Sequence, residues 1–575
     1  MDNITVNGGE SQKLDNQLNL ALSTEEITRD KSLNLNTGYE GDNRWELIIK
    51  YVGSLEKLYE LGVEVTPLLN NFAIIIIEEE LINVIANMQE IVYIEKPKSL
   101  YYEVVNSVRA SCIAPVQSEF KTYGEGVIIS VIDSGIDYKN SVFLDRFGNT
   151  RIINIWDQTD NSGTPPKGYN RGTLYDKEMI DEALKNNTSL NTRDLTGHGT
   201  AVASVAAGNF AENKLNNVGI ATKADIIAVK LGNPFRESFP KTSELMRAID
   251  FSLRKAIELK KPIVINISFG NSYGSHDGTS LLEQYINSVV GVWKNTIVIG
   301  TGNEGAAAGH YKGVIENNNT KAVAMAVGEF EPSLNLQLWK NYGDEFMIEI
   351  VTPGGRSTGV LGITGISESY SLGDTTLLVY YGEPTPFSTA QEIYIDFIPK
   401  DTYIESGIYQ ILLTPVKIVV GEFDMWLPVE GAVNDTRFLN PEPEVTITSP
   451  ATSLTAISVG AYDAYLNAYA DFSGRGFLRE NNLVKPDIVA PGVNIRAATA
   501  YGTDLFSGTS FATPVVSGAV ALLMEWGIVQ GNDLYMYGEK VKAYLIRGAR
   551  QLKGEETPSK RTGWGALCLA DSIPD

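Results

Sequence analysis

The stretch Leu505-Phe506-Ser507-Gly508-Thr509-Ser510-Phe511-Ala512-Thr513-Pro514 decides the fold of this chain. Glycine and hydroxyl residues run directly into residues 515–523, an apolar run of small side chains that predicts a buried helix with Pro514 in its first turn. Ser510 then lies at a helix N-terminus, where its backbone N–H has no intrahelical partner and the helix dipole favours negative charge. That position suits a nucleophile whose attack creates an oxyanion, and it is also typical of an ordinary N-cap serine.

Two upstream motifs offer partners for Ser510. Asp133 follows an apolar strand predicted over residues 127–132, where a buried carboxylate is costly unless a cation or a hydrogen-bond donor faces it. His198 lies in Gly-His-Gly-Thr at residues 197–200, at the start of a helix of small residues. Taken alone, Asp133 is typical of a turn and His198 of a structural histidine. With Ser510 they supply an orienting carboxylate, a base and a nucleophile in one chain.

These motifs resemble those of the subtilisin-like serine proteases. The family patterns are D-S-G-I-D at residues 133–137, G-H-G-T at 197–200, K-P-D-I-V-A-P-G at 485–492 and G-T-S-x-A-T-P at 508–514. The resemblance implies a hydrolase of the serine endopeptidase class. It implies that Ser510 attacks the scissile carbonyl, that His198 takes and returns the proton, and that Asp133 fixes the imidazole tautomer.

The same resemblance implies an oxyanion hole and a substrate cleft. Residues 300–305 match the family turn G-N-x-G, so the Asn303 side-chain amide and the Ser510 backbone N–H would bind the oxyanion. The substrate would contact a set of small or apolar residues, namely Ser268, Phe269, Gly270, Gly300, Thr301 and Gly302. Residues 300–305 also read G-x-G-x-x-G, but a dinucleotide site would need a helix to begin there, and the sequence leads instead into a β-rich segment.

The chain divides into segments of different pattern. Residues 1–102 are predicted to form a weakly ordered leader of about forty residues and then, over about 44–97, a βαββαβ unit of ferredoxin-like order. Residues 103–311 and 444–575 alternate apolar strands with helices, which is typical of an α/β doubly wound parallel sheet. Residues 312–443 carry short alternating strands and turns, which predict an inserted antiparallel β-sandwich or jelly roll.

The resemblance implies a role for the N-terminal unit, because subtilisin-like proteases carry a propeptide of this fold. We expect the chain's own propeptide to be a partner of the active site, with self-cleavage near Tyr101 or Tyr102. A permanently attached accessory domain is the alternative.

The composition limits which partners the chain can bind and in which compartment it is made. The net charge of −23 disfavours nucleic acid, and Cys112 and Cys568 alone predict neither a disulfide framework nor a cysteine metal site. The first residues lack a basic and an apolar region, and no stretch is expected to span a membrane, so we expect cytoplasmic synthesis.

No metal or other cofactor is predicted. His276 and His310 are expected to be structural, with lining of the cleft as the alternative, and without nearby carboxylates they do not indicate zinc. The strong calcium loop of the family is not clearly matched, since residues 212–219 are an abbreviated version, so calcium stays open.

Three departures from the simple secreted enzymes point to a branch of the family: a longer interval between Asp133 and His198, no signal peptide, and the inserted β-domain. They resemble the clostridial Csp germination proteases, which reside in the spore and activate the zymogen of a cortex-lytic enzyme. The resemblance implies selective cleavage of a protein zymogen. Two alternatives stay open: a degradative intracellular protease of broad specificity, and a binding protein whose cleft stays blocked by the propeptide.

Overall fold

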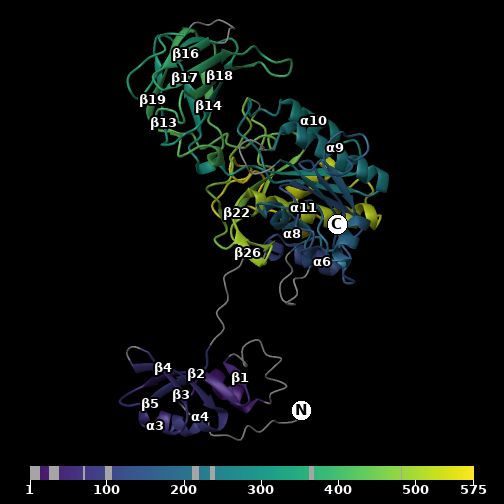
Figure 1. The fold of residues 1–575 in the computed structure, drawn as a ribbon, viewed down its shortest axis with the longest axis vertical. Coiled ribbons are helices and arrows are strands. Elements are labelled where there is room, and N and C mark those ends of the chain that lie inside the picture. The colour runs from purple at the N-terminus through teal and green to yellow at the C-terminus, as the bar shows by residue number, and fades with distance from the viewer. Residues whose placement is uncertain are drawn as a thin grey trace. The chain divides into compact units, whose positions relative to one another are not determined.

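The structure is a computed structural model that describes residues 13–24, 38–68, 71–97, 107–209, 219–232, 240–361, 368–480 and 482–574. Figure 1 shows the helices and strands with their labels. The chain forms two compact units, residues 1–103 and 104–575, and each is described by itself.

The first unit contains a five-stranded antiparallel sheet, in which β2, α3, β3, β4, α4 and β5 follow the predicted βαββαβ order and β1 is an additional strand. Strand β2 pairs with β1, β4 and β5, and β3 pairs with β4. Every second residue of β2 and β4 is buried, because alternate side chains of a strand point to one face. The elements are β1 (Tyr39–Gly41), β2 (Arg44–Tyr51), α3 (Glu56–Glu60), β3 (Glu64–Leu68), β4 (Phe72–Glu78), α4 (Glu79–Ala86) and β5 (Ile91–Glu95).

Part of the leader is ordered, so the prediction of a weakly ordered leader is wrong for residues 13–24. Helix α1 (Asn16–Ser23) places Leu18 and Ala21 in the core of the first unit, and Leu14 forms a bridge with Ile94 of β5. The spacing of three residues puts Leu18 and Ala21 on one face of α1, and Leu14 lies just before the helix. A short apolar stripe among many polar residues was too weak a signal in the sequence.

The second unit is built on a nine-stranded sheet whose order is β23-β22-β11-β10-β6-β9-β7-β8, with β24 also paired to β22. Its centre is parallel, as the apolar strand pattern predicts. The strands are β6 (Ile128–Asp133), β7 (Ile152–Asp157), β8 (Thr173–Asp176), β9 (Asp225–Lys230), β10 (Ile263–Ile267), β11 (Asn295–Gly300), β22 (Ile457–Asp463), β23 (Ala468–Tyr469) and β24 (Ile488–Pro491).

Helices cover both faces of this sheet and create two cores. Helices α8 (His198–Ala207) and α11 (Thr509–Met524) pack on one face, and α9 (Thr242–Leu259) and α10 (Leu281–Val289) pack on the other. Alternate residues of β6 enter the two cores, Ile129 the first and Ile128 the second. The α/β fold predicted from the sequence is confirmed. The remaining helices of this unit are α5 (Ser107–Ala110), α6 (Ile113–Phe120), α7 (Lys177–Lys185), α12 (Gly538–Arg547) and α13 (Leu569–Ser572), and β25 (Ile495–Thr499) pairs with β26 (Gly502–Phe506).

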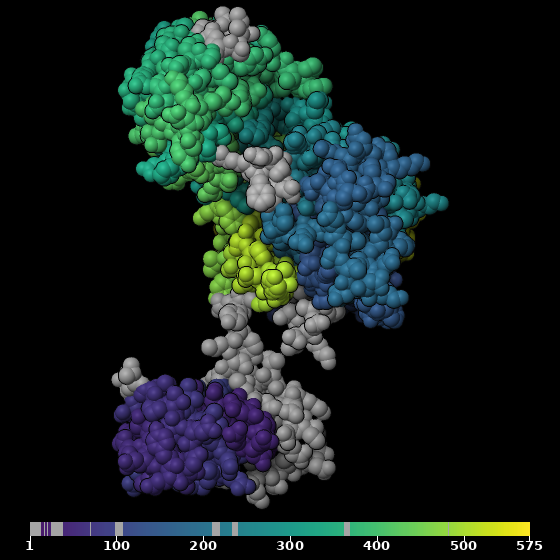
Figure 2. All heavy atoms as spheres, in the orientation of Figure 1, coloured from purple at the N-terminus to yellow at the C-terminus, as the bar shows by residue number. Residues whose placement is uncertain are grey.

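An antiparallel β-domain interrupts the α/β domain, and Figure 2 shows it in green beside the blue first half of that domain. A six-stranded sheet, β12-β20-β14-β18-β17-β16, and a four-stranded sheet, β15-β19-β13-β21, share one apolar core. The domain begins with His310, two residues before the predicted boundary. Its strands are β12 (His310–Val314), β13 (Lys321–Val327), β14 (Leu334–Asn341), β15 (Glu345–Val351), β16 (Glu368–Leu372), β17 (Thr375–Tyr381), β18 (Ala390–Pro399), β19 (Gly407–Lys417), β20 (Glu422–Trp426) and β21 (Arg437–Phe438).

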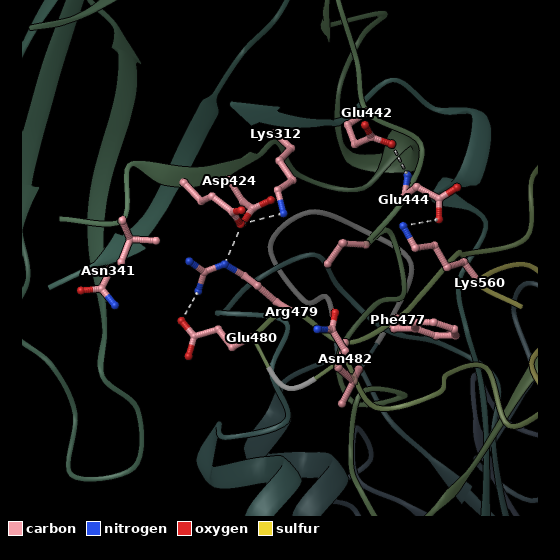
Figure 3. A pocket seen from close by; sticks show the side chains of 14 residues that line it. Lys312, Asn341, Asp424, Glu442, Glu444, Phe477, Arg479, Glu480, Asn482 and Lys560 are labelled. Carbon is pink, nitrogen blue, oxygen red and sulfur yellow. Dashed lines mark hydrogen bonds and ion pairs between the residues drawn. The ribbon is translucent and has the colours of Figure 1, made fainter. Parts of the chain in front are cut away.

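Buried polar contacts fix the β-domain to the α/β domain. The ring of Trp426 stacks between His276 and His310, with ring centroids 4.2 and 4.7 Å away. Asp424 accepts hydrogen bonds from Arg479 Nε (2.8 Å) and from His310 Nε2 (3.1 Å), and Figure 3 shows Arg479 at the wall of a 430 Å³ cavity between the two domains. Both histidines therefore take part in the contacts that join the two domains, which is a structural role.

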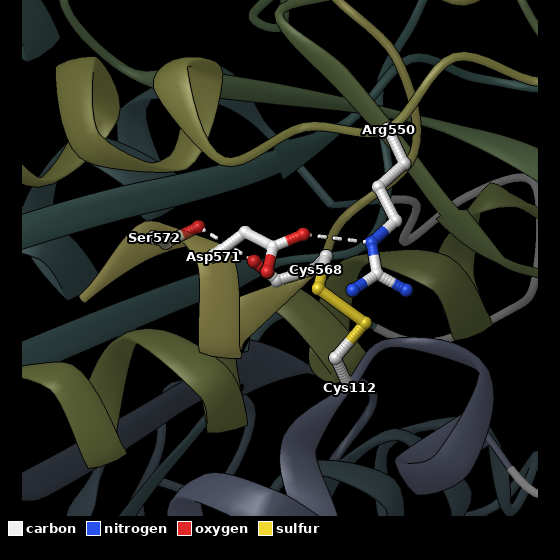
Figure 4. The surroundings of a disulfide bond; sticks show 5 residues. All are labelled: Cys112, Arg550, Cys568, Asp571 and Ser572. Carbon is white, nitrogen blue, oxygen red and sulfur yellow. Dashed lines mark hydrogen bonds and ion pairs between the residues drawn. A yellow bond between two sulfur atoms is a disulfide. The ribbon is translucent and has the colours of Figure 1, made fainter.

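The two cysteines form a disulfide with each other, a bond that the expectation of no disulfide framework did not include. Cys112 and Cys568 precede α6 and α13, and their Cα atoms are 4.9 Å apart (Figure 4). The backbone N–H of Leu569 also donates to the carbonyl of Ser111 (2.9 Å). The bond joins the beginning of the α/β domain to its end across 456 residues, a separation at which sequence gives no indication of contact.

One helical stretch among the described residues, Thr509–Val529, is long and apolar enough by composition to cross a membrane. Its apolar window is 89% buried inside the protein, because this is the central helix between the sheet and α8. A stretch of that length was not expected from the sequence.

Candidate active site

The three residues of the predicted triad lie where secondary structure elements begin or end. Asp133 is the last residue of β6, His198 the first of α8 and Ser510 the second of α11. Asp133 is 4% exposed, and its Oδ1 lies 2.7 Å from His198 Nδ1. Because a carboxylate accepts, Nδ1 carries the proton and Nε2 is left as the basic nitrogen.

The charge of His198 is set by opposing effects. Burial lowers the pKa of its imidazole, but the charge and hydrogen bond of Asp133 outweigh burial, and Asp194 adds to them, so the pKa is raised above its usual value. The surroundings therefore favour the imidazolium that forms when His198 takes a proton.

Asp194 is a residue that sequence reasoning missed. Its Oδ2 accepts from the backbone N–H (2.8 Å) and the hydroxyl (2.6 Å) of Thr200, and its Oδ1 accepts from the N–H of Gly197 (2.9 Å) and from Ser134 Oγ (2.8 Å). It thus satisfies orphan donors at the start of α8 and ties that helix to the turn after Asp133. In the sequence, the only indication of this role was that Asp194 is an acidic residue just before the G-H-G-T motif.

The close approach of α8 to that turn explains the glycine after His198. A Cβ on Gly199 would collide with the carbonyl oxygen of Gly135. The motif therefore needs glycine there, and the absence of a side chain lets His198 reach Asp133.

The hydroxyl of Ser510 donates to the carbonyl oxygen of Ser268 (2.9 Å) in this structure. No hydrogen bond joins it to His198 among the described residues, so a rotation about the Ser510 Cα–Cβ bond is needed to bring Oγ toward Nε2. Such contacts often tighten only when substrate binds.

Pro514 is the sixth residue of α11, not a residue of its first turn as predicted. Proline has no N–H, so the carbonyl four residues earlier, that of Ser510, lacks its helical donor. Ser268 Oγ donates to that carbonyl instead (3.1 Å). Asn266 Nδ2 donates to Ser268 Oγ, and Ser517 Oγ donates to Asn266 Oδ1, so a buried polar chain fixes the backbone of Ser510.

Two donors are available for an oxyanion beside Ser510. Asn303 Oδ1 accepts from the N–H (3.0 Å) and the hydroxyl (3.2 Å) of Thr509, which fixes the amide and leaves its Nδ2 donor without a partner in the described part of the chain. The N–H of Ser510 has no partner among the described residues. Both predicted donors are therefore close to the N-terminus of α11.

A cavity of 230 Å³ lies next to Ser510 and contains five of the six predicted substrate-contacting residues. Thr301 is the exception, because its side chain is fully buried and faces Ser473. Residues that sequence reasoning missed complete the wall, including Val429 and Gly431 from the loop between β20 and β21 of the β-domain. The lining consists of Ser268, Phe269, Gly270, Gly300, Gly302, Asn303, Glu304, Val429, Gly431, Thr448, Thr509 and Ser510.

Glu304 gives this cavity an ionisable wall. Burial raises the pKa of its carboxyl to about 7, against the effect of the Glu430 backbone N–H, which donates to Oε2 (3.1 Å). Glu304 begins a one-turn 3₁₀ helix (Glu304–Ala306), so residues 300–305 do not open the longer helix that a dinucleotide site would need.

The titration of Glu304 predicts a pH-dependent substrate preference. Its carboxyl is neutral below about pH 7 and negative above, so the preference for Lys over Met before the scissile bond should rise about tenfold between pH 6 and pH 8.5. The measurement is the ratio of kcat/KM for two peptides that differ only at this residue, in which the titration of His198 cancels. A flat ratio in the wild type, or a ratio that still rises in Glu304→Gln, would contradict the assignment.

Three further predictions concern a metal site, a calcium loop and the position of self-cleavage. Among the described residues there is no group of three or more His, Cys, Asp and Glu side chains that could hold a metal ion. Most of the loop considered for calcium, residues 212–218, lies outside the described residues, as do Tyr101 and Tyr102 at the proposed cleavage position.

Comparison with known proteins identifies the family. Residues 124–386 and 426–565 match the model of the subtilase family, and residues 12–98 match the model of the Csp protease B prodomain. The first match covers more than half of the chain, which therefore belongs to the subtilase family of serine proteases.

Within that family the chain is similar to the CspB protease of Clostridium perfringens. The solved structure of that protein is 37% identical, with a TM-score of 0.74, over 81% of this chain and 96% of that one. The minor extracellular protease Vpr of Bacillus subtilis is 23% identical over 78% of this chain and 52% of its own length. The subtilisin-like protease SBT3.17 of Arabidopsis thaliana is 26% identical over 70% and 54%. The chain thus spans about half the length of these two curated relatives.

Proposed function

We propose that this chain is a serine endopeptidase in which Ser510, His198 and Asp133 form the catalytic triad. The observation that carries the proposal is the 2.7 Å contact between the buried Asp133 carboxylate and His198 Nδ1, on a helix that packs against the one bearing Ser510. The Asp133 contact defines the tautomer that a general base needs.

The reaction follows from these positions. Ser510 Oγ leaves the Ser268 carbonyl, gives its proton to His198 Nε2 and forms a bond to the carbonyl carbon of the substrate. The oxyanion accepts hydrogen bonds from the N–H of Ser510 and from Asn303 Nδ2. His198 then protonates the leaving amine, and water releases the acyl group from Ser510 by the same steps in reverse order.

Removal of the side-chain donor tests the oxyanion hole. Asn303→Ala should lower kcat by about 10²–10³-fold with little change in KM, because the lost hydrogen bond strengthens as the carbonyl oxygen becomes negative. The substrate is an internally quenched peptide of residues 95–108 of this chain, which spans the proposed processing site. Asn319→Ala, in an exposed turn of the β-domain, is the control. A rise in KM without a loss of kcat would mean that Asn303 contributes only to substrate binding.

We propose further that residues 1–102 are a propeptide that the enzyme cuts off near Tyr101 or Tyr102. Two observations support this: the unit has its own apolar core, and residues 12–98 match the Csp protease B prodomain. The similarity to the CspB protease supports selective activation of a protein zymogen, the precursor of a spore cortex-lytic enzyme, during germination, by a protease carried in the spore. The proposed reaction uses no cofactor.

A direct test combines a serine-reactive fluorophosphonate with two protein substrates. The proposal predicts labelling of the wild type, loss of the label in Ser510→Ala, and a single cut in the zymogen under conditions that leave unfolded casein nearly intact. Rapid degradation of casein would favour a protease of broad specificity. No labelling of the wild type would favour a binding protein with a blocked cleft.

A further inference from the structure

Three buried side chains connect the interior of α11 with the backbone of Ser510. Ser517 Oγ donates to Asn266 Oδ1 (2.8 Å), and Asn266 Nδ2 donates to Ser268 Oγ (2.9 Å). Ser268 Oγ donates in turn to the carbonyl oxygen of Ser510 (3.1 Å). We call Ser517, Asn266 and Ser268 the polar chain.

The periodicity of a helix and a strand brings these side chains together. Ser517 lies about two turns after Ser510 on α11, so both residues are on the same face of that helix. Asn266 of β10 and Ser268 just after it are two residues apart, and alternate residues of extended chain point to the same face of a sheet. Val264, two residues before Asn266, belongs to the core beneath α8 and α11. The polar chain therefore lies on the α11 face of the sheet.

The polar chain is costly to bury. Ser517 and Asn266 are both 0% exposed, and Ser268 is 3% exposed. An amide and a hydroxyl in such surroundings destabilise the fold unless hydrogen bonds replace those to water. An apolar pair would fill the same space without that requirement, so packing alone does not account for the polar side chains.

The hydrogen bonds of the polar chain can run in one direction only. A carbonyl oxygen can only accept, so Ser268 must use its single hydroxyl hydrogen for Ser510. Ser268 then has to accept from Asn266, which must present its NH₂ group to Ser268 and turn its oxygen toward Ser517. The donation from Ser517 holds the amide in this orientation, because within the described residues it is the one hydrogen bond that Asn266 Oδ1 accepts.

The last bond of the polar chain has no substitute within α11. Pro514 has no N–H with which to donate to the Ser510 carbonyl. Without the Ser517 hydroxyl, the Asn266 amide can turn over and accept the hydrogen of Ser268. The Ser510 carbonyl then has no donor, and the backbone that carries the nucleophile is less firmly held.

We propose that Ser517 and Asn266 are positioning residues for the nucleophile, which act through Ser268. This inference rests on the proposed endopeptidase function. Neither residue is among those that line the catalytic cavity. A shift of the Ser510 backbone moves both Oγ and the N–H that binds the oxyanion, so the effect belongs to kcat rather than to KM.

Removal of one buried hydroxyl tests this proposal. Ser517→Ala should lower kcat for the peptide of residues 95–108 about tenfold with KM unchanged, and labelling by the fluorophosphonate should slow in parallel. The matched control is Ser252→Ala on α9, which removes a hydroxyl that is also 0% exposed and shares a hydrogen bond with Ser130 Oγ (2.8 Å). The control should lower Tm by a similar amount and keep the kcat of the wild type. An unchanged kcat in Ser517→Ala, or an equal loss in Ser252→Ala, would overturn the proposal.

A double variant separates positioning from packing. In Ser517→Ala/Asn266→Leu no amide competes for the Ser268 hydrogen, and leucine has nearly the shape of asparagine. Ser268 should donate to Ser510 again, so kcat should recover to within about threefold of the wild type, and replacement of both partners by apolar groups should also preserve folding. A double variant no more active than Ser517→Ala would show that the polar chain only supports packing, and the proposal would fail. If the wild type neither cleaves the peptide nor reacts with the fluorophosphonate, the endopeptidase function itself fails, and this inference with it.

Discussion

Ser510→Ala is expected to lower kcat for the peptide of residues 95–108 by about 10⁶-fold and to abolish labelling by a fluorophosphonate. The side chain lies at the N-terminus of α11, beside the two free donors that would bind an oxyanion. Without Oγ no acyl-enzyme can form, and the remaining donors can only assist direct attack by water. Stopped peptide assays and gel fluorescence of the labelled protein provide the two readouts.

The control for this variant is Ser507→Ala, three residues earlier in the same loop. The Ser507 hydroxyl accepts from the Asn494 N–H (3.0 Å), and within the described part of the chain it has no hydrogen bond to the proposed catalytic groups. It should keep activity within a few-fold of the wild type. Retention of the label in Ser510→Ala would place the nucleophile elsewhere.

Asp133→Asn is expected to lower kcat by about 10⁴-fold near neutral pH, with KM little changed. The amide can present a donor to Nδ1, which favours the tautomer that carries its proton on Nε2 and cannot accept one from Ser510. Because Asp133 raises the pKa of His198, its loss should also shift the acidic limb of the kcat/KM profile to lower pH. Both effects are read from pH–rate profiles of the two proteins.

Asp137→Asn is the matched control, because Asp137 belongs to the same D-S-G-I-D turn and accepts only from the Lys139 N–H (3.2 Å) among its recorded side-chain bonds. Its profile should overlay that of the wild type. An acidic limb that stays in place in Asp133→Asn would show that the contact does not set the His198 titration.

The parts of the site that the sequence predicts are those tied to local pattern. Asp133, His198 and Ser510 each adjoin an element whose apolar periodicity is clear, and parallel strands deliver their carboxyl ends to one edge of the sheet. Asn303 follows β11 for the same reason. The alternation of strands and turns also locates the β-domain within two residues of its first strand.

What the sequence could not predict depends on contacts between distant segments. The Cys112–Cys568 bond, the position of Val429 and Gly431 in the catalytic cavity, and the raised pKa of Glu304 all arise only when the β-domain and the chain ends are in place. Pro514 shows a different limit of prediction from the sequence, because its position alone does not reveal its effect. Its effect is understood only once Ser268 is seen donating to the carbonyl that proline leaves free.

The most direct test of the account is the intact mass and N-terminal sequence of the purified wild-type protein beside Ser510→Ala. The account predicts a wild-type chain cut near Tyr101 or Tyr102 and an uncut variant, which would identify Ser510 as the nucleophile and the first hundred or so residues as a propeptide. Full-length chains in both samples, or the same cut in both, would contradict self-processing by this site.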